Sequence, residues 1–260
     1  HDFHATAPLA QSGRLAPAHP PELDLTQQTL YDSIVNSCTT LFGREALFDK
    51  QGGLRGPWNA QVTSPALGKH MEELVSAVRH ESSLEPRLCE LAILVVGANW
   101  RLSYEWSLHE KLAHRAGLAK SAFPLVKELM PPKELEGVLQ PDELSVYQLS
   151  RELVNSKRVS ADTYASAKAA LGDDDKKISD LSMIIGCYLA VCAVVSMFEV
   201  PAGTSLPSED AISSAAVDAI GSAETAAVTP PEAEDGGNGI GADAAAVSSL
   251  GTLAARPRGE

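Results

Sequence analysis

The chain has 260 residues, of which 44% are hydrophobic and 21% charged, and its formal net charge is −13. This composition is typical of a soluble globular protein, and an acidic chain without a basic segment is not expected to bind nucleic acid. Much of the acidity is local: from residue 203 onward, nine Asp and Glu and two Arg give −7, which leaves −6 for the rest. The charge of the main part therefore says little about its ligand.

The two ends of the chain differ in composition from its middle. Residues 1–23 are rich in Pro and Ala and lack a core pattern, and residues 203–260 contain no aromatic residue, Met, Cys or Lys. Such segments bury too little apolar surface to offset the entropy of ordering, so we predict a disordered arm and a disordered tail around one domain at residues 24–202. We expect a cytoplasmic protein, and we keep secretion as an alternative because the chain begins with His1 rather than Met.

Helical periodicity runs through residues 24–202 and predicts an all-α domain of about eight helices. The first helix has one apolar face, formed by Leu30, Ile34, Cys38 and Leu41. Ser64-Pro65 supplies an N-cap and a first-turn proline for a second helix, in which apolar residues recur at helical spacing: Leu67, Met71, Leu74 and Val78. A third helix, from near Pro86 through "RLCELAILVVGANW", is apolar on most sides and is expected to be deeply buried.

A fourth helix is predicted within "WRLSYEWSLHEKLAHRAGL", with Gly117 as its C-terminal cap. Further helices are expected at about 119–129, 142–156, 160–171 and 175–199, and no segment alternates with the period of two that a half-buried strand shows. The last of them contains Leu181–Phe198, which is free of charge and just long enough to cross a membrane. Its small residues suit packing against other helices, so we predict that it is a core helix and not a membrane span.

Two features of the sequence bear directly on chemistry. Glu105 and His109 stand four residues apart, so a helix places a carboxylate and an imidazole on one face. From the residues alone, this pair fits a surface ion pair, a metal half-site or an acid–base couple. The four cysteines have no CxxC or metal-finger spacing and are expected to be buried, reduced thiols: Cys38, Cys89, Cys187 and Cys192.

Three blocks of the sequence together resemble the carboxymuconolactone decarboxylase family, which shares its fold with the alkyl hydroperoxidase D proteins. The blocks are "GPWNAQVTSPALGKHMEEL", "LEPRLCELAILVVGANWRLSYEWSLHEKLAHRAGL" and "GCYLAVCAVVSMFEVP", and the similarity covers about residues 25–202 in the same order. "EWSLH" placed after "RLCELAILVV" is the most specific part. The resemblance implies an all-helical, alkyl hydroperoxidase D-like fold, a site where the third and fourth helices meet, and assembly into trimers or higher homo-oligomers.

The chain departs from the peroxidase branch of this family at the two thiol positions. The motif of that branch is Glu, eleven residues, Cys, two residues, Cys, three residues and His. Here it places the Glu on Glu90 and the His on His109, but Leu102 and Glu105 occupy the cysteine positions. Peroxide reduction through this motif needs an attacking and a resolving thiol, so peroxidase activity is not expected. The Glu-Trp-x-x-His pattern resembles the decarboxylase-like branch, although Leu189 stands where many relatives have a His in the last helix.

Decarboxylation of an acid that is beta or vinylogous to a carbonyl needs no metal or organic cofactor. It needs a donor for the enolate oxygen, a proton source near neutral pKa and a dry pocket. His109 is the expected proton donor, Glu90 is expected to orient it, and Glu105 is the second titrating group near the helix start. We expect a cofactor-independent decarboxylase, or a related lyase or isomerase, acting on a small lactone or phenolic acid. A non-catalytic oligomeric scaffold or ligand-binding paralogue is the alternative.

Four further residues are candidates for substrate binding. Trp58 and Trp106 could wall a pocket, Tyr104 could donate to an oxyanion, and Arg87 could clamp a substrate carboxylate. Aromatic residues of this kind lie more often in a core than in a pocket, and Arg87 also fits a solvated surface or a partner for Glu90. No metal is expected, because Glu90, Glu105 and His109 would give only three ligands and no further His or Asp stands at the spacing of a fourth. The expected partners are a small-molecule substrate and further copies of the chain.

Overall fold

The computed structural model describes residues 13–42, 47–49 and 51–202, and every structural statement here refers to these residues. They form nine α-helices and three short 3-10 helices, with three isolated β-bridges and no strand. The all-α class predicted from helical periodicity is confirmed. The predicted tail at residues 203–260 and the first twelve residues of the predicted arm lie outside the described residues.

The α-helices follow one another along the chain as α1 Leu25–Phe42, α3 Gly56–Thr63, α4 Pro65–His80, α5 Pro86–Trp100, α6 Ser103–Arg115, α7 Phe123–Lys127, α8 Pro141–Ser156, α9 Ala161–Ala170 and α10 Asp175–Met197. The 3-10 helices are Pro20–Glu22, Lys120–Ala122 and Pro132–Leu135. Proline in the first turn starts α4, α5 and α8, because its missing N–H would be unpaired there in any case. Gly117 follows the end of α6 with a φ of 103°, as its predicted role as a cap requires.

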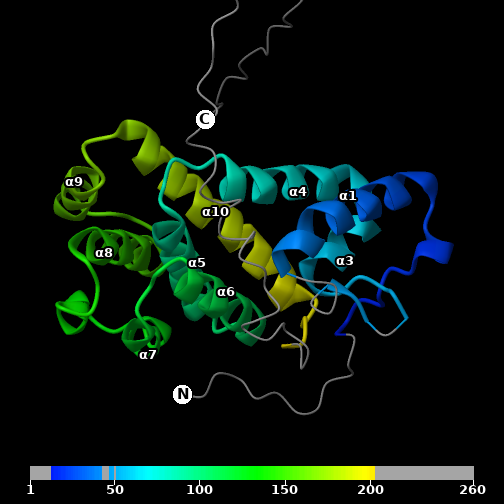
Figure 1. Ribbon diagram of the computed structural model, residues 1–260, viewed down its shortest axis with the longest axis horizontal. Helices are drawn as coiled ribbons and strands as arrows, with labels where there is room; N and C mark the ends of the chain where they lie inside the picture. The colour runs from blue at the N-terminus through cyan, green and yellow to red at the C-terminus, as the bar shows by residue number, and fades with distance from the viewer. Residues whose placement is uncertain (1–12, 43–46, 50, 203–260) are drawn as a thin grey trace, which may run out of the picture. The chain divides into compact units, whose positions relative to one another are not determined.

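Helix α5 lies in the middle of the described part (Figure 1) and packs against α6, α8 and α10. Helices α7, α8 and α9 lie on one side of it and α1 and α3 on the other, while α4 and α10 extend across. Two hydrophobic clusters result. The larger surrounds α5, and the smaller joins α1, α3 and neighbouring residues with Leu108 and Leu112 of α6. Because α6 contributes to both clusters, its inward residues lie where the two meet.

The chain joins the helical domain before residue 24. The backbone N–H of Ala18 donates to Asn59 Oδ1 at 2.7 Å, and Asn59 Nδ2 donates to the carbonyl of Ala16 at 2.6 Å. The N–H of Arg14 donates to the carbonyl of Phe198, next to the end of α10, at 2.8 Å. The described domain therefore extends further toward the N-terminus than the predicted boundary, because a buried amide on α3 pairs with a segment whose composition shows no core pattern.

Helix α4 turns inward only part of its predicted apolar face: Val78 is buried and Met71 packs against the larger hydrophobic cluster. Leu67 and Leu74 are 75% and 41% exposed, whereas Gly68, Glu72 and Arg79 are buried. The reason is the close approach of α3: a Cβ on Gly68 would lie 2.1 Å from a backbone carbonyl oxygen of that helix. This contact fixes the rotation of α4 about its axis. Glu72 and Arg79, one and three turns after Gly68, therefore point into the domain.

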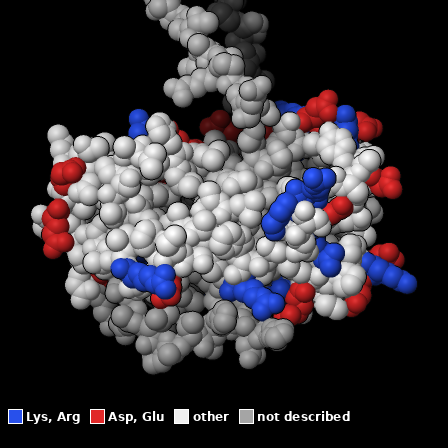
Figure 2. Space-filling view, turned by 180° about the vertical axis from the view of Figure 1, so that it is seen from behind, with Lys and Arg blue, Asp and Glu red and all other residues white. Residues whose placement is uncertain are grey.

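Helix α10 is buried on one face only. Leu181, Ile185 and Tyr188 belong to the core, whereas Met183 and Met197 are 62% and 64% exposed. Among the described helices, α10 is the one that is long and apolar enough to cross a membrane by length and composition, and 44% of its most apolar window is buried. Figure 2 shows that, on the face it presents, the charged side chains gather away from a broad uncharged middle. The predicted core helix is thus core on one side and leaves an open apolar face on the other.

Candidate functional site

Glu90 is the one charged residue in the fully buried stretch of α5, residues 88–98. An unpaired carboxylate in such a place would cost several kcal/mol, about the penalty of burying an uncompensated charge, so Glu90 needs a partner. His109 Nδ1 lies 2.7 Å from Glu90 Oε2, and the two side chains are 2% and 3% exposed. The predicted contact between these residues is confirmed, whereas its catalytic role stays a prediction.

The second carboxylate approaches the other ring nitrogen of His109. Glu105, one turn earlier on α6, places Oε2 3.4 Å from His109 Nε2 in an equally buried position. The surface ion-pair interpretation is therefore wrong. Because the two imidazole nitrogens point in opposite directions, the ring and both carboxylates cannot share one metal ion. Within the described residues, no three His, Cys, Asp or Glu side chains are placed to hold a metal.

Two residues that the sequence pattern did not indicate complete the cluster. Arg79 of α4 lies 3.9 Å from Glu90, between Nη1 and Oε1, and donates from Nη2 to the Tyr188 hydroxyl at 2.6 Å. The Tyr188 ring of α10 meets the His109 ring edge to face, with centroids 5.0 Å apart. Arg79 could have been predicted from the sequence, because it lies on the same helix face as Gly68. The leucines of α4 instead indicated a different face as the buried one.

The cluster is electrically balanced when His109 is protonated. Glu90 and Glu105 supply two formal negative charges, and Arg79 and the imidazolium supply two positive ones. Burial alone lowers the pKa of His109, but the charges of the two carboxylates and their contacts with the ring outweigh it and raise the pKa above its ordinary value. Burial raises the pKa of Tyr188 well above the usual phenol range, so this group remains neutral. The raised pKa favours the protonated ring, the form that can donate a proton.

The three aromatic candidates for substrate binding are buried in the core. Trp58, Tyr104 and Trp106 are 5%, 5% and 3% exposed. Trp58 belongs to the smaller hydrophobic cluster and the other two to the larger. The ammonium of Lys127 lies 5.3 Å above the Trp106 ring, and the Tyr104 hydroxyl has no hydrogen-bond partner among the described residues. Their contacts with a substrate stay predictions.

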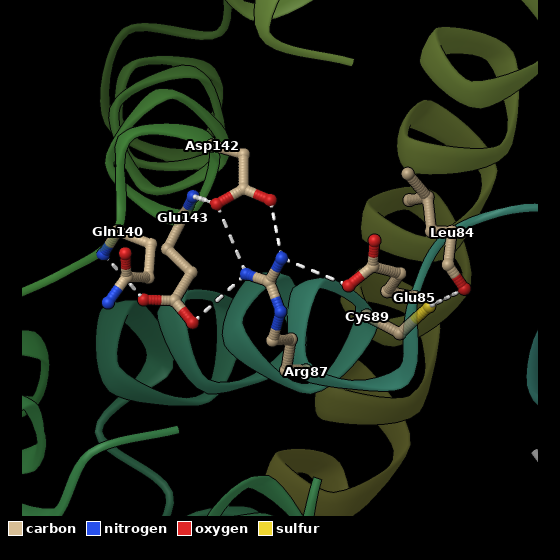
Figure 3. Close-up of polar contacts among 7 residues, drawn as sticks. All are labelled: Leu84, Glu85, Arg87, Cys89, Gln140, Asp142 and Glu143. Atoms are coloured by element: carbon tan, nitrogen blue, oxygen red, sulfur yellow. Dashed lines mark hydrogen bonds and ion pairs between the residues drawn. The ribbon is translucent and has the colours of Figure 1, made fainter. Parts of the chain in front are cut away.

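Arg87 does not belong to the cluster, and its role as a clamp for a substrate carboxylate stays a prediction, one that its contacts do not favour. As Figure 3 shows, its guanidinium contacts Asp142 at 2.5 Å, Glu85 at 2.9 Å and Glu143 at 3.0 Å. The hydrogen bond to Asp142 is the largest of several effects that raise the pKa of Arg87. Three carboxylates already outnumber its single positive charge, so an incoming anion would be repelled. Arg87 instead joins the start of α5 to α8.

The thiols take no part in the contacts around His109. Leu102 precedes the first turn of α6 and Glu105 lies within it, so the two thiol positions of the peroxidase motif hold an apolar and an acidic side chain. The four cysteines are free and buried, as predicted. Burial raises the pKa of Cys89 to about 12 and of Cys187 to about 11, which keeps these thiols protonated and unreactive near neutral pH.

A groove of about 620 Å³ lies between α6 and α7, and its walls include Lys111, His114 and Lys127. It borders the outer face of α6, about half a turn around the helix from Glu105 and His109. None of the cluster residues lines it. The groove is therefore separate from the candidate acid–base site.

Comparison of the chain with protein-family models and with curated proteins gave no match in either case. The resemblance to carboxymuconolactone decarboxylases therefore rests on the sequence blocks quoted above, and membership of that family remains a proposal.

Proposed function

We propose that the protein is a cofactor-independent acid–base enzyme of the carboxymuconolactone decarboxylase type, which releases CO₂ from a small lactone or phenolic acid or carries out a related lyase or isomerase step. The observation that carries the proposal is the His109 ring, held between Glu90 and Glu105 where all three side chains are at most 4% exposed. A charged triad of this kind is costly to bury, and such arrangements cluster at functional sites.

The proposed step uses His109 as a proton donor. The bond between the substrate carbon and its carboxylate breaks, CO₂ leaves, and the electron pair remains as an enolate. The imidazolium then gives a proton to the enolate carbon and regains one from water. The Nε2 proton is the better candidate, because its carboxylate lies at 3.4 Å, whereas Glu90 holds Nδ1 at 2.7 Å and fixes the ring. Low dielectric around the site disfavours the substrate carboxylate and so favours its loss.

The alternative is a scaffold or ligand-binding paralogue that keeps the fold without turnover. The observation in its favour is the tight closure of the cluster: His109 is 2% exposed, so a substrate reaches it only if the packing around the ring opens. Peroxidase activity is the least supported alternative, because Leu102 and Glu105 occupy the positions of the reactive pair, and the cysteines of the chain are buried, with the pKa values of Cys38 and Cys89 raised by burial.

Self-association is part of the proposal. The exposed face of α10 carries Met183 and Met197 beside the small residues Gly186 and Ala193, and no charge occurs from residue 181 to 198. We expect further copies of the chain to cover this face in a trimer or higher oligomer. Light scattering at micromolar concentration should detect it, and Met183→Glu should weaken it. A monomer in the unmodified protein would contradict this part of the proposal.

Turnover is tested with a panel of carboxylated lactones and phenolic acids in buffer containing a metal chelator. CO₂ release without added cofactor, with deuterium from D₂O appearing on the product carbon, is the expected result. His109→Asn and Glu90→Gln should abolish it. His114→Asn on the same helix, outside the cluster, is the matched control and should retain it. Turnover that survives in H109N, or peroxide reduction that disappears with one cysteine, would refute the proposal.

A further inference from the structure

Four side chains from four helices form a closed circuit that includes the His109 ring of α6. Glu90 of α5 places Oε2 2.7 Å from His109 Nδ1, and its Oε1 lies 3.9 Å from Arg79 Nη1 of α4. Arg79 Nη2 donates to the Tyr188 hydroxyl of α10 at 2.6 Å, and the Tyr188 and His109 rings close the circuit with centroids 5.0 Å apart. The four residues are 2–7% exposed. A change in any one of these contacts therefore bears on the others.

The distance between Arg79 and Glu90 is the unusual one in this circuit. A hydrogen bond between a guanidinium and a carboxylate measures about 2.7–2.9 Å, and the planar guanidinium often binds both oxygens at once. Here Nη1 and Oε1 stay 3.9 Å apart, beyond hydrogen-bond distance, although the two groups are buried and opposite in charge. His109 holds the other oxygen of the carboxylate at 2.7 Å. Glu90 therefore gives its close contact to the imidazole and not to the guanidinium.

The hydroxyl of Tyr188 accounts for this distance. It accepts a hydrogen bond from Arg79 Nη2 at 2.6 Å, and because the guanidinium is a rigid plane, fixing one of its nitrogens restricts the other. Burial raises the pKa of Tyr188 well above the usual phenol range, so the hydroxyl is neutral and does not cancel the charge of Arg79. Arg79 therefore acts on Glu90 through its charge, without a hydrogen bond between them.

We propose that Arg79 and Tyr188 are positioning residues that together set how tightly His109 holds its proton. Arg79 draws part of the negative charge of Glu90 away from the imidazole, and Tyr188 limits this effect because it holds the guanidinium back. Glu105 faces the other ring nitrogen. Further titratable groups interact with Arg79 or Glu105 but stay neutral, since burial raises their pKa values: Cys38, Cys187, Cys192 and Tyr104. The inference rests on the proposed function, in which the imidazolium is the proton donor, and it names the groups that tune that donor.

A pH titration of the full chain without substrate, followed by NMR at the imidazole nitrogens of His109, tests the proposal. Arg79→Gln leaves the charge of Glu90 to the ring alone and should raise the pKa of His109 by at least about one unit, a tenfold change in proton affinity. Tyr188→Phe keeps the aromatic ring but removes the hydroxyl. The guanidinium can then close on Glu90, so the pKa of His109 should fall.

Each variant has a matched control outside the cluster. Lys69→Gln removes a positive charge from the same helix as Arg79, at an exposed position where the lysine pairs with Glu73. Tyr164→Phe removes a hydroxyl from a tyrosine of α9 that is 44% exposed. Both controls should leave the titration of His109 unchanged.

Shifts in opposite directions separate positioning from a general loss of structure, which would move the pKa of His109 toward its ordinary value in both variants. An unchanged or lower pKa in R79Q, or an unchanged or higher one in Y188F, would overturn the proposal. If one variant does not fold by circular dichroism, the other decides. The two proposals also fail separately: opposite shifts without CO₂ release keep the positioning role and remove the decarboxylase, whereas His109-dependent turnover with unshifted titrations does the reverse.

Discussion

The charge balance of the cluster predicts that Glu105→Gln weakens the hold of His109 on its proton. Glu105 Oε2 lies 3.4 Å from His109 Nε2. At that separation, and with an effective dielectric constant of about 20, the attraction between two unit charges is about 5 kcal/mol. Gln keeps the volume of the side chain and removes the charge. Because about 1.4 kcal/mol corresponds to a tenfold change in an equilibrium constant, losing even a third of this attraction shifts His109 more than about tenfold toward the neutral ring.

Nitrogen chemical shifts of the imidazole, followed by NMR through a pH titration, measure this change. The pKa of His109 in the unmodified protein should lie above the ordinary histidine value, and in E105Q it should be lower than in the unmodified protein. The resonance of His114, which lies on the same helix and outside the cluster, is the internal control. Coincident titration curves for His109 in the two proteins would refute the reasoning, because the carboxylate at 3.4 Å would then exert no influence on the ring.

Three further predictions follow from the same contacts. Because the pKa of His109 is raised in the folded state, its contribution to the free energy of unfolding is complete below about pH 6.5 and is lost as the pH rises through the folded pKa. Urea midpoints should therefore fall over that range, and fall less in His109→Gln. Arg87→Met should cost about 1–3 kcal/mol in urea unfolding, since it leaves the 4% exposed Glu143 without its cationic partner, and should not move the His109 titration. A thiol reagent should modify the native cysteines only as fast as the chain opens, whereas rapid reaction of any of the four would contradict their burial.

The parts of the site that lie on strongly patterned helices could be predicted from the sequence. Glu105 and His109 share a face because i and i+4 residues always do on a helix. Glu90 could be placed beside them because a carboxylate inside so apolar a segment needs a partner. Helix α3 was not predicted as a separate element, since its eight residues are too few to establish a period.

The remaining contacts depend on residues far apart in the chain. Arg87 takes its partners Asp142 and Glu143 from a helix that begins more than fifty residues later, and no local pattern announces that pairing. The same holds for Arg79 and Tyr188, which are 109 positions apart. In each case the sequence gives the type of side chain, and only the packing of two helices decides whether it meets a partner or the solvent.

The rotation of α4 bears on whether the buried charges are functional. Leu67 and Leu74 are exposed on this helix while Glu72 and Arg79 are buried. Fully burying a leucine side chain is worth about 1.5–3 kcal/mol, and replacing buried charges by apolar groups is often stabilising. A helix selected for stability alone would therefore turn its leucines inward, or carry apolar residues at positions 72 and 79. The domain keeps these charges inside, with Arg79 beside Glu90 of the His109 cluster, and this conflict between local pattern and packing is the one expected where a site, rather than the core, sets the choice of residues.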